Sequence, residues 1–238
     1  MKMKFKIRLS DEEYKKIDFK KIYSKANEII ALSKSVNIFP FKVKKLVYEF
    51  SDIKIVSFKT AKEKFNIDIK LFGSESAIIQ ECNGVSIIFY NQDEKPQRVK
   101  FSIIHEFGHF ILGHKMNLTE DDPLYHRQEV EANCFAAQIL MPEQILRKCS
   151  DRGYYSSPEY IKGIFDVSDE ASEKRRDTLA KTNYDWKSRE EKEYDDIILL
   201  KYNDFINSVA PYKAEFYSYE DEYEKQQERD TWFNGERW

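Results

Sequence analysis

Apolar side chains recur at a spacing of three to four residues over much of the chain, which predicts a mostly helical protein. Residues 11–35 carry such a stripe, and Ser10 or Asp11 is suited to cap its N-terminus. A proline-initiated helix is expected from about Pro40 to Phe50. Further helices are predicted over 61–65, 96–113, 127–140 and 143–149, with two more between 157 and 179.

A different pattern precedes the helix that starts at Pro96. Residues 53–58 alternate between apolar and polar, as a strand does, and 77–90 contain two apolar runs around Asn83-Gly84. Asn-Gly tolerates the positive φ angles of a tight hairpin turn. We therefore predict an α+β fold, with a small antiparallel sheet beside the helix at 96–113 and a mostly helical C-terminal region.

The helix at 96–113 carries candidate chemistry in the run H-E-F-G-H. Its two histidines, His105 and His109, are four residues apart, so they lie on one face of a helix and can aim at one point. Two imidazoles suit Zn²⁺, and the carboxylate of Glu106 beside them can take a proton from water at the metal. Gly108 costs helix stability, which is tolerable if something approaches the backbone closely there.

A catalytic zinc site needs a third protein ligand and an open position. His114 is offset by one residue from the position that a histidine-only motif requires, so we do not assign it as a ligand. The helix at 127–140 offers Glu129 and Glu131, which cannot both face the metal. Helical phase favours Glu129, because Asn133 lies on the same face and can hold a free N–H of a ligand histidine.

Composition narrows the class of protein. The 238 residues are 41% hydrophobic and 34% charged, with a net charge of −3, which argues against a chain-wide nucleic-acid footprint. Three widely spaced cysteines indicate neither a disulfide framework nor a cysteine zinc site. The chain starts without an apolar signal region and contains no run long enough to span a membrane, so a cytoplasmic location is expected.

Charge is uneven along the chain. Residues 1–100 carry 21 basic against 13 acidic side chains, whereas 184–238 carry 8 against 15. The acidic C-terminal stretch also holds 13 of the 35 aromatic residues, which is unlike ordinary disorder. Acidic and aromatic residues together suit docking on a basic surface, which residues 1–100 can supply. We predict a helix over Tyr194–Val209 packed on the protein in this way. The stretch after Tyr219 is expected to be loosely held, as a frayed end or as a segment that regulates access to the site or binds a partner.

Two blocks of sequence resemble the ImmA/IrrE family of metallopeptidases. Arg98-Val-Lys-Phe-Ser-Ile-Ile-His-Glu-Phe-Gly-His109 is similar to that family's R-x-x-F-t-x-x-H-E-x-G-H. Glu129-Val-Glu-Ala-Asn-Cys-Phe-Ala-Ala-Gln-Ile-Leu-Met-Pro142 is similar to its E-x-E-A-N-x-F-A-x-x-L-x-M-P. Looser similarity extends to 165–179, so the resemblance covers about residues 35–180.

The resemblance implies a zinc site of the gluzincin kind, with His105, His109 and Glu129 as ligands and Glu106 as general base. It also implies proteolysis of a helix-turn-helix repressor. Some members carry a fused helix-turn-helix domain at the N-terminus, but the residues before the similar region are too few here, so we expect the repressor to be a separate protein. The expected division is a peptidase domain at 1–150, a helical subdomain at 151–183 and an extension at 184–238.

Three alternatives stay open at this point. The chain could be a non-catalytic, metal-stabilised module that sequesters a repressor, although such a module has no need of Glu106. The oxyanion donor could be Tyr125, His126 or His114. Residues 157–180 could form a DNA-binding helix pair through Lys174, Arg175 and Arg176, but the acidic residues around this cluster favour a solvated or packing role.

Overall fold

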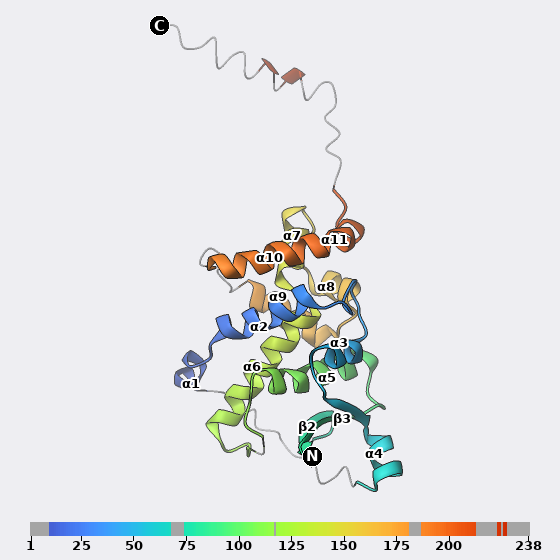
Figure 1. Ribbon diagram of the computed structural model, residues 1–238. Coiled ribbons are helices and arrows are strands. Elements are labelled where there is room, and N and C mark those ends of the chain that lie inside the picture. The colour runs from blue at the N-terminus through green and yellow to red at the C-terminus, as the bar shows by residue number, and fades with distance from the viewer. Residues whose placement is uncertain are drawn as a thin grey trace.

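The computed structural model describes residues 10–67, 74–116, 118–180, 187–212, 223–224 and 226–227. Helices dominate these residues, and a small three-stranded sheet lies at the lower end of the molecule in Figure 1, below α3 and α5. The helices are α1 (Asp11–Lys15), α2 (Phe19–Leu32), α3 (Val43–Phe50), α4 (Phe58–Phe65), α5 (Pro96–Ile111), α6 (Pro123–Leu140), α7 (Glu143–Asp151), α8 (Pro158–Phe165), α9 (Asp169–Leu179), α10 (Arg189–Lys201) and α11 (Asn203–Val209). The strands are β1 (Lys54–Ser57), β2 (Ala77–Cys82) and β3 (Val85–Tyr90). The α+β prediction is confirmed.

The sheet has the order β1-β3-β2. Strands β2 and β3 form the predicted antiparallel hairpin, with Asn83 and Gly84 both at positive φ (53° and 76°). Strand β1 instead pairs parallel with β3, so the expectation of a purely antiparallel sheet was wrong. The chain leaves β1 through α4 and forms the β2–β3 hairpin before β3 returns beside β1, and such a crossover connection permits parallel pairing.

Several predicted helix boundaries differ from the structure. The helix expected from about Pro40 starts at Val43, with Lys42 as its N-cap. The stripe at 11–35 is divided into α1 and α2, because Asp18 caps a new helix by accepting a hydrogen bond from the Lys21 N–H (3.0 Å). The second candidate ligand helix starts at Pro123, four residues earlier than predicted, with Asp122 as its N-cap. Tyr125 and His126 therefore lie inside α6 rather than before it.

Helices α5 and α6 pack against each other in the middle of the molecule, and α5 also contacts β2 and β3 (Figure 1). Gly108 allows their close approach: a Cβ atom at this position would lie 2.9 Å from the Phe135 ring and 3.4 Å from the Ala132 carbonyl. The close contact expected at this glycine is thus with α6. Because α5 and α6 carry all the candidate ligands, this packing sets the distance between them.

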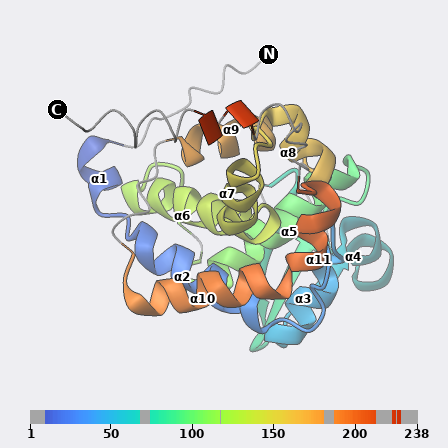
Figure 2. The ribbon, with the colours of Figure 1, turned by 90° about the horizontal axis from the view of Figure 1, so that it is seen from above.

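The C-terminal helices complete the core. The predicted helix at 194–209 is observed as two helices, α10 and α11, which meet at Tyr202. Ile198, Tyr202 and Ile206 are buried in the same hydrophobic cluster as residues of α2 and α6. Seen from above, α10 runs beside α2 (Figure 2). The stretch after Tyr219 lies almost wholly outside the described residues.

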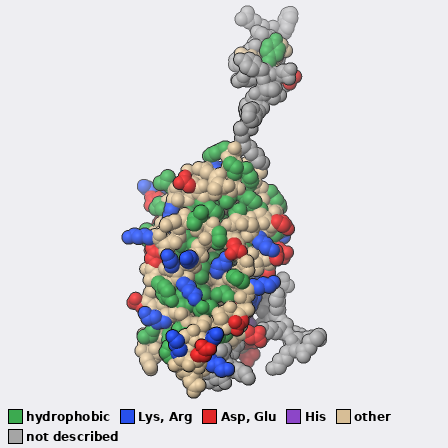
Figure 3. Space-filling model, turned by 90° about the vertical axis from the view of Figure 1, so that its right-hand side faces the viewer, with side chains coloured by type: hydrophobic (Ala, Val, Ile, Leu, Met, Phe, Trp, Pro, Cys, Tyr) green, Lys and Arg blue, Asp and Glu red, His purple; other side chains and the backbone are tan. Residues whose placement is uncertain are grey.

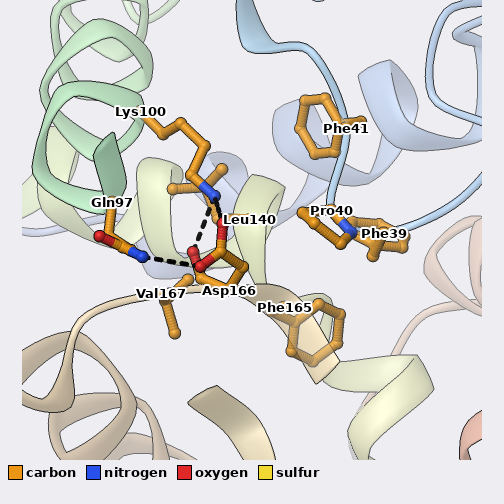
Figure 4. Close-up of a pocket in the computed structure, with 9 residues that line it drawn as sticks. All are labelled: Phe39, Pro40, Phe41, Gln97, Lys100, Leu140, Phe165, Asp166 and Val167. Atoms are coloured by element: carbon orange, nitrogen blue, oxygen red, sulfur yellow. Dashed lines mark hydrogen bonds and ion pairs between the residues drawn. The ribbon is translucent and has the colours of Figure 1, made fainter. Parts of the chain in front are cut away.

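Helices α8 and α9 are joined to α5 by Asp166, the αL residue (φ 49°) that ends α8. Its carboxylate accepts hydrogen bonds from Gln97 (2.8 Å) and Lys100 (2.5 Å) at the edge of a hollow lined by aromatic rings (Figure 4). The described core is continuous from α2 through α8 to α11, and the boundaries at 150 and 183 stay a prediction.

The basic cluster of α9 is not a uniform surface patch. Arg175 is buried and donates hydrogen bonds to the Met141 carbonyl (2.9 Å) and the Gln138 side chain, so its guanidinium joins α9 to α6. Lys174 and Arg176 are paired with Glu170 and Asp177 on their own helix. One of the three cations thus has the packing role that the sequence favoured.

The molecular surface seen from the right of Figure 1 mixes both signs of charge with hydrophobic side chains (Figure 3). Across the described part of the chain, no helix combines the length and apolarity needed to cross a membrane.

Candidate metal centre

Two imidazoles from α5 face each other across one helical turn. The Nε2 atoms of His105 and His109 are 3.1 Å apart, and the exposed fractions of the two side chains are only 13% and 12%. The i and i+4 spacing in the sequence therefore produces the convergence expected of it.

Glu129 of α6 completes the cluster. Its carboxylate spans the two rings, with one oxygen 3.4 Å from Nε2 of His105 and the other 3.3 Å from Nε2 of His109. These three residues are the cluster in the described chain that could hold a metal ion. Ligands at about 2.0–2.1 Å from a tetrahedral Zn²⁺ are spaced about 3.3–3.4 Å apart, so the donor set and its spacing fit this metal.

Electrostatics within the cluster favour an ionised carboxylate. Burial acts to raise the pKa of Glu129, but hydrogen bonds and charge interactions with His105 and His109 outweigh it and hold the pKa well below its ordinary value. Burial likewise acts to lower the pKa of His105, and the neighbouring carboxylates Glu129 and Glu106 raise it overall. A cation is thus favoured beside Glu129, as a metal site requires.

Asn133 supports His105 from behind. Its side-chain oxygen lies 3.2 Å from Nδ1 of His105, on the side of the ring away from Glu129. This is the contact that helical phase predicted, one turn after Glu129 on the same face of α6. An amide oxygen accepts a hydrogen bond from Nδ1–H, which keeps the proton on Nδ1 and leaves Nε2 available to the metal.

Glu106 is held by the edge of the sheet. One carboxylate oxygen accepts a hydrogen bond from the backbone N–H of Ile79 in β2 (2.9 Å). Burial raises the pKa of Glu106 above its ordinary value, although the two histidines and the Ile79 N–H act in the opposite direction. The carboxylate is therefore fixed in direction and more basic than an exposed glutamate.

His114 and Glu131 lie on the far side of His109, a placement that the sequence reasoning missed. Helix α5 ends at Ile111 with Leu112 as its C-cap, Gly113 takes a left-handed conformation (φ 69°), and the His114 N–H returns to the His109 carbonyl (3.0 Å). This Schellman turn brings His114 back over the last helical turn. An offset of one residue has a fixed angular meaning only within a continuing helix, and Gly113 is the sequence signal that this helix stops before His114.

The three candidate oxyanion donors are now distinguishable. Both ring nitrogens of His114 are engaged, with His109 and with Glu131 (2.9 Å each). Nε2 of His126 is buried and has no hydrogen-bond partner among the described residues. Tyr125 lies one turn before Glu129, and burial followed by the charges of Glu129, Glu120 and Glu106 raises its pKa to about 12. Its phenol is thus a protonated donor that interacts with the cluster electrostatically.

The hollow of Figure 4 is a separate feature. It is lined by residues 39–41, by Gln97 and Lys100 at the start of α5, by Leu140 and by residues 165–167, and no histidine is among them. The cluster of His105, His109 and Glu129, with Glu106 beside it, is therefore the candidate site.

An H-E-x-x-H helix beside a small sheet, with a glutamate from a second helix facing both histidines, defines a protein of the metallopeptidase type. More particularly, the family model described as the IrrE N-terminal-like domain, Peptidase M78, matches residues 51–177, more than half of the chain. The chain belongs to this peptidase family. A search of curated proteins found no match.

Proposed function

We propose that the protein is a zinc-dependent endopeptidase that cleaves a separate helix-turn-helix repressor. The observation that carries the catalytic part is the convergence of three ligand atoms, from His105, His109 and Glu129, beside a carboxylate aligned by Ile79. The family membership supports the reaction class. The resemblance to ImmA/IrrE metallopeptidases supports the repressor as substrate.

His105, His109 and Glu129 would hold the metal ion. When bound, Zn²⁺ supplies a Lewis acid that polarises the scissile carbonyl and acidifies water. Glu106 accepts a proton from the attacking water and passes it to the leaving amine nitrogen. Its hydrogen bond to Ile79 keeps the carboxylate directed during both transfers, and partial burial keeps it basic enough to accept the proton.

Tyr125 is the donor that we assign to the developing oxyanion. It lies on the same face of α6 as Glu129, one turn toward the N-terminus. A phenol that stays protonated can donate a hydrogen bond to the negative oxygen of the tetrahedral intermediate. Replacement by phenylalanine would remove this donor and keep the ring.

The experiment is incubation of the zinc-loaded protein with candidate helix-turn-helix repressors from the same genome, in parallel with Glu106→Gln. The substitution is nearly isosteric and removes only the base. We expect the parent to cleave the repressor, and the variant to bind zinc normally and leave the repressor intact.

Two results contradict this proposal. Equal cleavage by Glu106→Gln would exclude Glu106 as the base. Tight binding of the repressor by the parent without cleavage would instead support the alternative, a metal-stabilised module that sequesters a repressor.

A further inference from the structure

Behind His109, hydrogen-bonded side chains lead away from the candidate metal centre in the order His109, His114, Glu131. We call these three residues the relay. Nε2 of His109 faces Glu129, and Nδ1, on the other side of the ring, is 2.9 Å from Nδ1 of His114. Nε2 of His114 is in turn 2.9 Å from a carboxylate oxygen of Glu131. The exposed fractions of the His114 and Glu131 side chains are only 5% and 18%, so water competes little for these contacts.

The proton positions in this chain follow from the hydrogen-bond network. An ionised carboxylate only accepts, so Nε2 of His114 carries the proton that it donates to Glu131. With a single proton on the ring, Nδ1 of His114 presents a lone pair. Two nitrogens 2.9 Å apart can bond only if the other one donates, so Nδ1 of His109 carries a proton. Nε2 of His109 is then the nitrogen that faces Glu129 and His105, where a metal ion would replace the proton that Nε2 shares with Glu129.

Helix α6 and its neighbour hold the outer end of the chain. The second oxygen of Glu131 lies 3.9 Å from Nε of Arg127, one turn earlier on α6. Arg127 also lies 3.5 Å from Glu13 of α1. At the inner end, the turn at Gly113 fixes the backbone of His114 against the carbonyl of His109. Glu131 is thus held by Arg127 and His114 by the turn at Gly113, so both outer members of the relay are fixed in place.

We propose that His114 and Glu131 are positioning residues that hold His109 in the Nδ1–H tautomer required of a metal ligand. The proposal deepens the proposed function and rests on it for the identity of the metal site. It gives His109 the same kind of support that Asn133 gives His105, through an imidazole and a carboxylate in place of an amide. Partners of this type typically change metal affinity by about 10–100-fold when they are removed.

The first test reads the tautomer directly in the metal-free protein. Labelling histidine with ¹⁵N gives only four imidazoles to assign. We expect Nδ1 of His109 to be protonated in the parent, and His114→Phe to shift His109 toward the Nε2–H form. The same substitution should weaken zinc binding by about 10–100-fold in competition with a chelating dye.

A second pair of variants separates the relay from a purely structural role of Glu131. The amide oxygen of Glu131→Gln can still accept from His114, whereas Glu131→Met has similar length and offers no comparable acceptor. Both remove the charge that faces Arg127. The relay therefore predicts near-parental tautomer and zinc affinity for Glu131→Gln and loss of both for Glu131→Met, while a structural ion pair predicts equal damage. This pair also keeps the proposal testable if His114→Phe fails to fold.

Protonated Nε2 and unprotonated Nδ1 on His109 of the parent would overturn the relay, as would equal zinc affinities in Glu131→Gln and Glu131→Met. Neither result depends on cleavage. Conversely, turnover that survives Glu106→Gln would overturn the proposed mechanism and leave the tautomer result standing, so the two failures are distinguishable.

Discussion

Glu129 and Glu131 are two residues apart on α6 and face different partners. Glu129 spans both imidazoles of the cluster, whereas Glu131 faces His114 behind it. We expect Glu129→Ala to lose zinc, because a ligand is removed, and Glu131→Ala to bind zinc stoichiometrically when the metal is in excess, with weaker affinity. Metal analysis after gel filtration in buffers with and without added zinc measures both. Loss of zinc only in Glu131→Ala would reverse the assignment.

The relative positions of site residues could be predicted where the residues lie on the same regular helix. The spacing of His105, Glu106 and His109, and the phase of Glu129 with Asn133, are local properties of α5 and α6. His114 was not placed, because its position depends on where α5 stops rather than on helical phase. The hydrogen bond from Ile79 to Glu106 was also out of reach, since it joins a strand to a helix 27 residues further along the chain.

At the scale of secondary-structure elements, the distance between α5 and α6 depends on Gly108. A methyl group there would lie 2.9 Å from the buried ring of Phe135, so Gly108→Ala requires Phe135 to shift, and we expect α6 to move away from α5 with it. We expect a net loss of stability, because overpacking costs about 1–3 kcal/mol and better helix propensity offsets at most about 1 kcal/mol. Zinc affinity should fall as well, since Glu129 moves away from the histidines. Urea unfolding and zinc titration measure the two effects.

Gly163 provides the matched control for that substitution. It lies within α8, and a Cβ atom added there would meet nothing within 4 Å. Gly163→Ala should therefore gain up to about 1 kcal/mol of stability from helix propensity and leave zinc binding unchanged. Equal effects at the two glycines would contradict a specific role of the α5–α6 contact.

Glu49 joins the end of α2 to α3 and makes this connection pH-dependent. Burial acts to raise its pKa, but hydrogen bonds from residues 33–35 outweigh it and lower the pKa from 4.5 to about 2. A depressed pKa stabilises the fold above the unfolded value, and this contribution is lost as the pH falls from about 4.5 toward 2. We expect the parent to melt higher than Glu49→Gln at pH 6 and the difference to shrink below pH 4.5. Thermal unfolding across this pH range measures it, and a constant difference would contradict the assignment.

Elements were predictable where their signals are local. Asn83-Gly84 specified the hairpin and Pro96 the start of α5. The parallel pairing of β1 with β3 could not be predicted in this way, because it depends on contacts between segments about 30 residues apart. The start of α10 does have a local signal that the prediction did not include. Ser188 and Glu191 form a capping box, and α10 starts there, five residues before the predicted helix.

At the scale of the whole molecule, the C-terminal helices are part of the hydrophobic core rather than an appendage. Ile198, Tyr202 and Ile206 are almost fully buried, and Lys201 donates hydrogen bonds to carbonyls at the end of α2. Truncation before Ser188 would expose this surface. We expect that variant to lose cooperative unfolding and to aggregate, as measured by circular dichroism and light scattering.

Truncation before Glu220 keeps α10 and α11 and serves as the control. We expect an unchanged melting temperature. Faster cleavage of the repressor by this variant would support a regulatory role for the last residues, whereas unchanged cleavage and partner binding would indicate a frayed end. A lowered melting temperature, or loss of cooperative unfolding as in the longer truncation, would contradict the placement of the core boundary at α11.

Composition predicted that the acidic C-terminal region docks on the basic front of the chain, and the physical basis proved to be different. The contact of α10 with α2 is built on buried apolar side chains, with the cation Lys201 supplied by the C-terminal side. One ion pair of the expected sign, Lys20 with Glu191 (3.3 Å), lies at its edge. Net charge over a long segment does not specify which residues enter an interface.

The sequence separations of these contacts have a consequence for the order of folding. Asn133 and His105 are 28 residues apart, and Glu131 and His114 are 17 apart, whereas Lys201 bonds to Ile30 across 171 residues. Closing a short loop costs less entropy and occurs faster than closing a long one. We therefore expect the ligand helices to pair early and the docking of α10 on α2 to come late. Substitutions at Ile198 should then accelerate unfolding with little effect on the folding rate, while Gly108→Ala should slow folding itself.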